Sequence, residues 1–279
     1  MNFDRILYSI GVDRMQLSKV VIIGAQPNLA RNLVRCGLGH VVSIDFDRTG
    51  PENLQRQDYS RADIGRPKGE VVGREVLGIN PDVEVQTYDR DFCEMSSDEV
   101  QEIVGDSDLL IGATDSFWAQ ARVNLEAVRL GIPALWIGLY RLGRAGEIIY
   151  YVPGLTACFR CVASSRYAAF AAGRASVPSE GGTIFDLQIV DAIGGQIAVG
   201  ILTRGAPNRY GRLIDQLGNR NLLQVKIDPE YRLGDKDIFK QYLGDHPAQF
   251  SFSTIALPME VDPECPDCAP VRAEGLSRS

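Results

Sequence analysis

The sequence predicts an α/β protein with a doubly wound, mostly parallel sheet, an antiparallel extension toward the C-terminus and a structural zinc site. Apolar runs alternate with helical patterns over the first 150 residues, which indicates parallel strands joined by helices. After Tyr150 the pattern changes to that of antiparallel strands. Four cysteines also form two Cys-x-x-Cys pairs. The chain has 279 residues, 45% of them hydrophobic, and is long enough to bury the core that such a sheet requires.

The segment VVIIGAQPNLARNLVRCGLGHVVSIDFD, residues 20–47, opens the sheet. Val20–Ile23 is a continuous apolar run of the kind found in buried parallel strands. A helix over Asn28–Cys36 and a second strand follow, which is typical of a Rossmann-like nucleotide-binding unit. The second strand ends at Asp45, 21 residues after Gly24. A carboxylate at this offset receives ribose hydroxyls in such units, although many strands end in Asp because of the turn that follows.

The remaining elements follow at regular spacing. We predict, in chain order, a helix over 68–77, strands over 83–88 and 107–115, a helix over 117–130, strands over 134–140 and 146–154, a helix over 185–203, and antiparallel strands around 221–228 and 248–261. Residues 162–183 are rich in Ala, Ser and Gly and are predicted to form a mobile crossover or lid. We expect a nucleotide-binding region over 1–150. Over 151–279 we expect the crossover, a helix, antiparallel strands, cysteine knuckles and a frayed tail, all within one continuous domain.

Composition and charge exclude several classes of function. The net charge is −7 and the isoelectric point about 5.0, so a broad basic face for nucleic acid is not expected. No apolar run reaches the 18 residues typical of a membrane span, and the N-terminus lacks the apolar core of a signal peptide. We therefore expect a cytoplasmic protein that does not bind membranes, whose cysteines are thiols or metal ligands rather than disulfides.

Cysteine spacing is the strongest single signal. The pairs are Cys158-Phe-Arg-Cys161 and Cys265-Pro-Asp-Cys268. Two such knuckles supply the four thiolates of a closed tetrahedral zinc shell, which is typical of structural zinc. Redox dithiols and coincidence are the alternatives. Cys36 and Cys93 stand alone in the sequence, and we interpret both as small buried residues.

Five short motifs follow one another in a fixed order. They are Asp45-Phe-Asp47, Asn53-Leu-Gln-Arg56-Gln57, Asp63-Ile-Gly65-Arg-Pro-Lys68, Asn80-Pro81 and Thr114-Asp115. This order resembles the ThiF/MoeB/ubiquitin-activating (E1-like) family of adenylating enzymes, whose segments read D-x-D, N-L-x-R-Q, D-I-G-x-x-K, N-P and T-D. The segment Val152-Pro-Gly-Leu-Thr156-Ala-Cys158 also resembles the family's entry into its first zinc knuckle. The resemblance extends over about residues 3–268.

The resemblance implies that ATP and Mg²⁺ activate the C-terminal carboxylate of a ubiquitin-like protein or peptide as an acyl-adenylate. Arg56 and Lys68 would contact phosphates, Asp115 would hold Mg²⁺, and Asp45 would hold the ribose. The implied residues are, as catalytic groups, Arg5, Arg56, Lys68 and Asp115, and, as nucleotide-binding groups, Gly24, Asp45, Asp47, Asn53 and Gln57. Arg5 would reach into the partner subunit of a homodimer. The alternatives are that Arg56 and Lys68 are solvated surface charges and that Asp115 caps the following helix.

The sequence departs from the family in two places. The pattern G-x-G-x-x-G is matched by Gly24, Gln26 and Leu29, so the glycines that allow close phosphate approach and close helix packing are replaced. Residues 162–264 contain no cysteine, which excludes a thioester at the family's usual place. The chain therefore resembles the branch that works without a catalytic cysteine, such as the microcin-modifying (MccB) enzymes. A catalytically inactive subunit that binds a partner protein is the alternative, and an NAD-dependent oxidoreductase ranks last because it leaves the later motifs and the cysteines unexplained.

Overall fold

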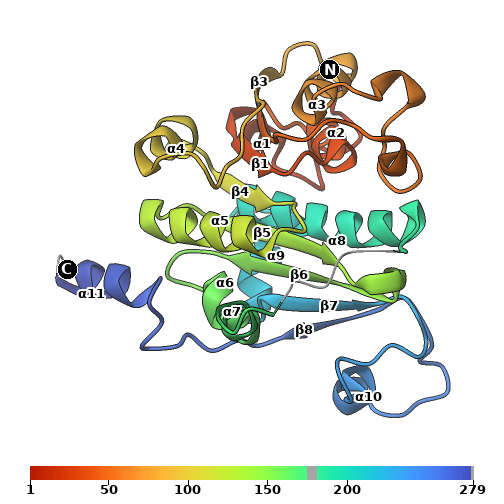
Figure 1. Cartoon of the computed structure of the whole chain (residues 1–279), viewed down its shortest axis with the longest axis vertical. Helices are drawn as coiled ribbons and strands as arrows, with labels where there is room; N and C mark the ends of the chain where they lie inside the picture. The colour runs from red at the N-terminus through yellow and green to blue at the C-terminus, as the bar shows by residue number, and fades with distance from the viewer. Residues whose placement is uncertain (175–180, 278–279) are drawn as a thin grey trace.

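The computed structural model describes residues 1–174 and 181–277. Its centre is an eight-stranded sheet with the order β3-β2-β1-β4-β5-β6-β7-β8 (Figure 1). The five parallel strands are β1 (Lys19–Ile23), β2 (His40–Ile44), β3 (Glu84–Tyr88), β4 (Leu109–Gly112) and β5 (Ala134–Leu139). The antiparallel strands are β6 (Ala145–Tyr151), β7 (Leu222–Lys226) and β8 (Ser253–Leu257). The predicted parallel sheet with an antiparallel extension is confirmed.

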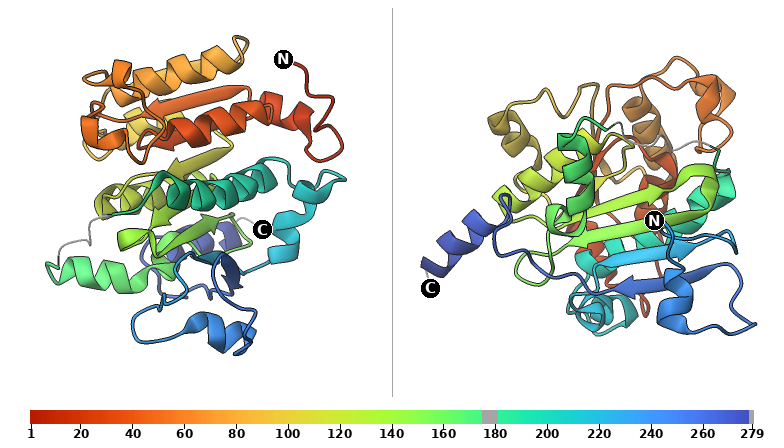
Figure 2. Two further views of the ribbon diagram at one scale, coloured as in Figure 1. Left: turned by 90° about the vertical axis from the view of Figure 1, so that its right-hand side faces the viewer. Right: turned by 60° about the horizontal axis from the view of Figure 1, so that its bottom comes forward.

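Helices cover both faces of the sheet, as the doubly wound prediction requires (Figure 2). One face carries α1 (Val12–Leu17), α2 (Pro27–Arg35), α3 (Lys68–Ile79), α8 (Ile184–Leu202) and α9 (Arg209–Leu217). The other carries α4 (Ser97–Val104), α5 (Phe117–Leu130) and α6 (Phe159–Val162), with α7 (Ser164–Ala171) beside them. Outside these layers lie α10 (Ile238–Leu243) and α11 (Ala269–Ser277), which projects from the body of the molecule (Figure 1).

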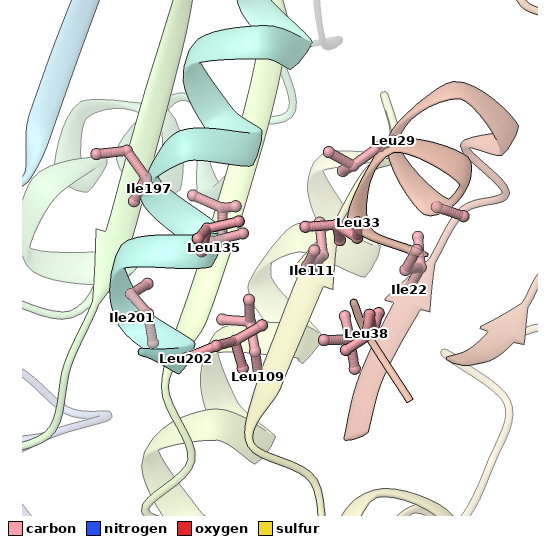
Figure 3. Packing of buried hydrophobic residues seen from close by; sticks show 14 of the residues in the cluster. Ile22, Leu29, Leu33, Leu38, Leu109, Ile111, Leu135, Ile197, Ile201 and Leu202 are labelled. Carbon is pink, nitrogen blue, oxygen red and sulfur yellow. The ribbon is translucent and has the colours of Figure 1, made fainter. Parts of the chain in front are cut away.

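Alternating strand residues divide the core into two halves. Along β1, Val20 and Ile22 face one cluster and Val21 and Ile23 face the other, because successive side chains of a strand point to opposite faces. Figure 3 shows the first cluster, in which side chains of α2 and α8 pack against β1, β4 and β5. By length and composition alone α8 would suit a membrane span, but here its inner face packs on β5 and β6.

The structure corrects several element predictions. The predicted crossover at 162–183 contains the helix α7, and the expected frayed tail contains α11. Residues 175–180 of the predicted lid lie outside the described residues. The sequence reading also missed α4, α9 and α10.

Candidate active site

The predicted site lies at the carboxyl edge of the parallel strands, where the strand order reverses between β1 and β4. Doubly wound sheets bind ligands in the crevice at this position. A cavity of about 190 Å³ opens here. It is lined by Ile23–Gly24, Ile44–Asp47, Arg90–Cys93, Thr114–Ser116 and Trp118–Ala119. Segments that follow β1, β2, β3 and β4 therefore meet at one cavity.

Gly24 is required at the turn that leaves β1. Its φ is +85°, and a Cβ atom there would lie 2.6 Å from the carbonyl oxygen of Ala113. The next backbone N–H, of Ala25, donates to Oδ2 of Asp45 at 2.6 Å, and the N–H of Asp47 donates to Oδ1 at 2.7 Å. Burial raises the pKa of Asp45, while these two N–H groups oppose the shift. The Asp45 carboxylate thus holds the turn in shape and borders the cavity.

The two replaced glycines are accommodated by the packing around α2. Pro27 occupies the first turn of α2, where the missing N–H costs no helical hydrogen bond. The side chain of Gln26 is largely buried. Leu29 is buried against α8 at Gly195, where an added Cβ would lie 3.5 Å from Cδ1 of Leu29. An added Cβ at Gly195 would therefore make only ordinary van der Waals contact, and Leu29 fits against α8 without a clash.

Lys68 is held beside the cavity by Asp47. Its Nζ lies 2.9 Å from Oδ2 of Asp47, and its backbone N–H donates to the carbonyl oxygen of Asp47 at 2.9 Å. The ammonium group is mostly buried, since the side chain is 13% exposed. Asp63, earlier in the same motif, is structural: burial opposes its ionisation, but hydrogen bonds from Arg74 and Ser60 outweigh this and lower its pKa to about 2.

The segment from Asn53 to Gln57 forms a turn after β2, and its residues are not among those that line the cavity. Oδ1 of Asn53 accepts a hydrogen bond from the N–H of Gly50 at 2.8 Å, which shapes the turn. Oε1 of Gln57 is buried and accepts no hydrogen bond from the described residues. Arg56, which lies between Asn53 and Gln57 in the sequence, is half-buried.

Asp115 is exposed at the end of β4, and its suggested role as a helix cap is wrong. Ser116 caps α5 instead, because its Oγ accepts the hydrogen bond from the N–H of Ala119 at 3.4 Å. Among residues 1–174 and 181–277, none forms a hydrogen bond or ion pair with the Asp115 carboxylate. An exposed carboxylate at a cavity wall is a suitable oxygen ligand for Mg²⁺.

Arg5 lies away from the other predicted residues within one chain. It belongs to the N-terminal segment, whose Met1 and Phe3 line a second cavity with Gly37–His40 and Glu84, at the amino edge of the sheet. Arg5 itself is exposed. Its predicted role in a partner subunit stays a prediction.

The sequence reading missed four residues that line the cavity: Phe46, Arg90, Cys93 and Trp118. Each follows a predicted strand end, and that position was the available signal. Phe46 and Trp118 are 59% and 58% exposed, so both present aromatic surface beside the cavity. Burial raises the pKa of Cys93 to about 11, so its thiol is protonated at neutral pH.

The four predicted metal ligands meet on the face of the sheet that carries α5. Their Sγ atoms all lie within 4.8 Å of one another. The Sγ atom of Cys158 lies 3.6 Å from that of Cys161 and 3.7 Å from that of Cys265, and the Cys161–Cys268 separation is 3.7 Å. Four thiolates bound at about 2.3 Å would stand about 3.8 Å apart at the corners of a tetrahedron. The cluster thus matches the size of a tetrahedral zinc site with four cysteine ligands.

The chain is similar in sequence to curated adenylyltransferases. The chain is 31% identical over 161 residues to a sulfur carrier protein adenylyltransferase of Thermus thermophilus, which covers 54% of this chain and 58% of that protein. It is 33% identical over 158 residues to a sulfur carrier protein ThiS adenylyltransferase of Bacillus subtilis, which covers 54% and 46%. The chain spans about half the length of these curated relatives.

Solved structures share the fold. The crystal structure of E. coli MccB with ATP matches 92% of this chain and 68% of that chain, with a TM-score of 0.67 and 20% sequence identity. The sequence model of the ThiF family matches residues 3–203, well over half of the chain. The chain belongs to the ThiF family.

Proposed function

We propose that the protein is an ATP-dependent adenylyltransferase that activates the C-terminal carboxylate of a ubiquitin-like protein or a peptide. The observation that carries the proposal is the meeting of Asp45, the Asp47–Lys68 pair and Asp115 around the Gly24 turn at one cavity. Membership of the family and the activities of its adenylyltransferase relatives support it.

The reaction forms a bond between a carboxylate oxygen and the α-phosphorus of ATP and breaks the bond from that phosphorus to the bridging oxygen of pyrophosphate. Two anions approach each other, so positioned cations supply most of the catalysis. In this proposal Lys68 and Arg56 neutralise phosphate oxygens and Asp45 accepts from the ribose hydroxyls. Asp115 holds Mg²⁺, which supplies further positive charge at the phosphates. The acyl-adenylate passes directly to an external nucleophile, since residues 162–264 hold no cysteine and the Cys93 thiol is protonated.

The cysteine cluster is proposed to hold a structural zinc ion. Four thiolates fill a tetrahedral shell and leave no position for substrate. We also propose that the protein is a homodimer in which Arg5 completes the partner's site, and that it works in the cytoplasm, where its thiols stay reduced.

Radiolabelled pyrophosphate exchange into ATP, with candidate carboxylate peptides, tests the activity. Calorimetric binding of ATP with Mg²⁺ needs no knowledge of the substrate. Lys68→Ala and Asp115→Asn should each weaken ATP binding at least tenfold, since each removes a charged contact worth about 1.5–3 kcal/mol. Lys240→Ala is the matched control, because Lys240 forms an exposed ion pair with Asp245 outside the cavity. Wild-type protein that binds no ATP at millimolar concentration contradicts the proposal.

A second candidate is a catalytically inactive subunit that binds a partner protein. Gln26 and Leu29, which fill both replaced glycine positions with larger side chains, favour it. It predicts no pyrophosphate exchange with any carboxylate, with dimerisation and metal content intact.

A further inference from the structure

The cysteine cluster and the nucleotide cavity lie on the same face of the sheet, and both contact α5. Residues inside the knuckles reach this helix directly. The N–H of Phe159, between Cys158 and Cys161, donates to Oδ1 of Asn124 at 2.9 Å. Oδ2 of Asp267, between Cys265 and Cys268, accepts from Nδ2 of the same Asn124 at 2.7 Å. Asn124 is fully buried, so both knuckles are fixed to the middle of α5.

The knuckles also reach α7. Oδ1 of Asp267 accepts from Nη1 of Arg160 at 2.9 Å, and the Arg160 guanidinium lies 4.6 Å from the ring centre of Tyr167. The Phe159 ring lies 6.2 Å from the Tyr167 ring, measured between ring centres. Cation–π and aromatic pairs of this kind stabilise the positions of the side chains that form them. The position of α7 thus depends on the arrangement of the knuckles.

From α7 the contacts continue to the cavity wall. Phe117, at the start of α5, meets the Tyr167 ring edge-on at 4.9 Å and the Phe170 ring at 5.3 Å. Phe170 stacks on Trp118 with ring centres 5.8 Å apart and ring planes 19° apart. Trp118 lines the cavity, with Asp115 three residues before it. A continuous row of aromatic rings therefore joins the cysteine cluster to the candidate nucleotide site.

We propose that the metal centre at the four cysteines sets the position of Trp118 at the nucleotide cavity, through Phe159, Tyr167 and Phe170. This deepens the proposed function and rests on it for the identity of the ligand. Phe170 is a positioning residue, because it touches Trp118 rather than the cavity. An exposed aromatic ring without a packing partner is not fixed in one orientation. For Trp118, stacking on Phe170 supplies that partner.

Loss of the metal is expected to shift α7 rather than release it. An ion pair between Arg166 and Glu147 of β6 holds α7 on the sheet independently of the knuckles. The expected consequence is a local change at Phe170 and Trp118 while the sheet stays folded. Such a change is measurable by fluorescence, since the chain has only two tryptophans, Trp118 and Trp136.

The experiment uses the full chain with Trp136→Phe, which leaves Trp118 as the sole indole. Acrylamide quenching is compared before and after zinc removal by a chelator, with metal content measured and circular dichroism recorded. Removal should raise the quenching constant by up to about 1.7-fold, the ratio of full exposure to the present 58%. Phe170→Ala should show the raised constant already with zinc bound and respond no further to the chelator. Phe170→Tyr should respond as the parent does.

A second variant keeps the test valid if zinc removal unfolds the chain. Asp267→Asn weakens the contacts to Asn124 and Arg160 and leaves all four cysteines in place, so the quenching constant should rise with stoichiometric zinc still bound. Phe250→Ala is the control, because Phe250 is an exposed aromatic residue outside the row. The proposal is overturned if Asp267→Asn and Phe170→Ala leave Trp118 quenching unchanged, or if the purified protein binds no metal.

This test contains no nucleotide, so its failure is distinct from failure of the proposed function. If the protein binds ATP but Trp118 quenching does not respond to changes at the cysteine cluster, the proposed function stands and this inference is wrong. If Trp118 responds to the cluster, Phe170→Ala should also weaken ATP binding severalfold, and Phe170→Tyr should restore it. Unchanged ATP affinity in Phe170→Ala would contradict the link to the nucleotide site.

Discussion

The two faces of the sheet are packed by different means. On the face that carries α2 and α8, helices approach closely at small residues such as Gly200, and the buried carboxyl of Asp191 lies between α2 and α8. On the face that carries α5, the cysteine cluster and a row of aromatic rings fill the space. The first face is held mainly by packed apolar side chains and contains a carboxyl whose burial costs stability. The second contains four cysteines that together form a complete set of tetrahedral metal ligands.

This difference predicts which kind of substitution destabilises each face. A face held by a metal centre fails when one ligand is removed, because binding free energy contributes directly to folding. A face held by close packing is destabilised by small steric changes and by burial of a charged group. The candidate nucleotide site lies at the end of both, with Gly24 from one side and Trp118 from the other. Four predictions test the contrast, from the largest expected effect to the smallest.

Cys158→Ser should lower the free energy of unfolding by more than about 4 kcal/mol, because metal loss belongs to the few changes with effects of that size. Thermal unfolding and metal analysis measure it. Cys36→Ser is the control, since Cys36 is half-buried outside the cluster and its loss should leave the metal content unchanged. A wild type that contains no zinc, or that keeps its stability without it, would show that the cluster does not hold this face.

Asp191→Asn should stabilise the protein at pH 8 by roughly 2–4 kcal/mol. Burial raises the pKa of Asp191 to about 7, while Asn28 opposes the shift with a hydrogen bond at 3.4 Å, and Oδ1 has no partner among the described residues. Because the folded-state pKa is raised, the stability contributed by Asp191 is complete below about pH 4 and is lost as the pH rises toward 7.

Denaturant unfolding of both proteins between pH 4 and 8 gives this difference. The gain of Asp191→Asn over wild type should grow with pH through this window. Asp215→Asn, an exposed carboxylate of α9, should show no such growth. A gain independent of pH would mean that the charge of Asp191 is not the cause.

Gly24→Ala should destabilise the protein by about 2–3 kcal/mol, because a left-handed φ costs an alanine roughly 1–2 kcal/mol and the added Cβ meets the carbonyl of Ala113. ATP binding should weaken with it, since Ala25 and Asp45 move together. Gly78→Ala is the matched control. Gly78 lies in α3 with open space around its Cβ position, so alanine should be neutral or stabilising there. Equal changes in stability for Gly24→Ala and Gly78→Ala would show that the turn does not require glycine at position 24.

Asp63→Asn should cost about 1–3 kcal/mol at neutral pH, because it weakens a hydrogen-bonded pair with Arg74 at a buried position. The pKa of Asp63 is lowered to about 2, so its contribution is present above about pH 4 and is lost as the pH falls toward 2. Unfolding measured down this range should show wild type and variant converging. Curves that stay parallel would show that folding leaves the pKa of Asp63 unchanged.

Much of the fold could be predicted because apolar runs in a parallel sheet are local signals. The strands around Val20–Ile23 and the helix over 117–130 follow from such runs. The helix α4 was missed although Ser96 and Glu99 form a capping box, a signal present in the sequence. The helix α7 has no apolar period, and contacts of Tyr167 and Arg166 with distant segments hold it.

The residues of the candidate site could be predicted where they belong to a sequence motif, but not where only the folded structure brings them together. Cys158 and its three partners have a spacing that specifies their chemistry, and the structure brings them together. Trp118 and Phe46 have no sequence signal beyond their place after a strand, because four separate segments must converge before they share a cavity. Asp191 was also missed, since a single carboxyl in an apolar helix acquires its meaning only from what packs against it.

The buried carboxyl of α8 has a consequence for the newly made chain. This helix has 19 residues and is apolar enough to cross a membrane, so the insertion machinery of a cell would meet a segment close to a membrane span. A carboxylate at the centre of a bilayer costs about 2.5–3.5 kcal/mol. The carboxyl of Asp191, which destabilises the fold when it ionises, therefore also disfavours insertion of α8 into lipid.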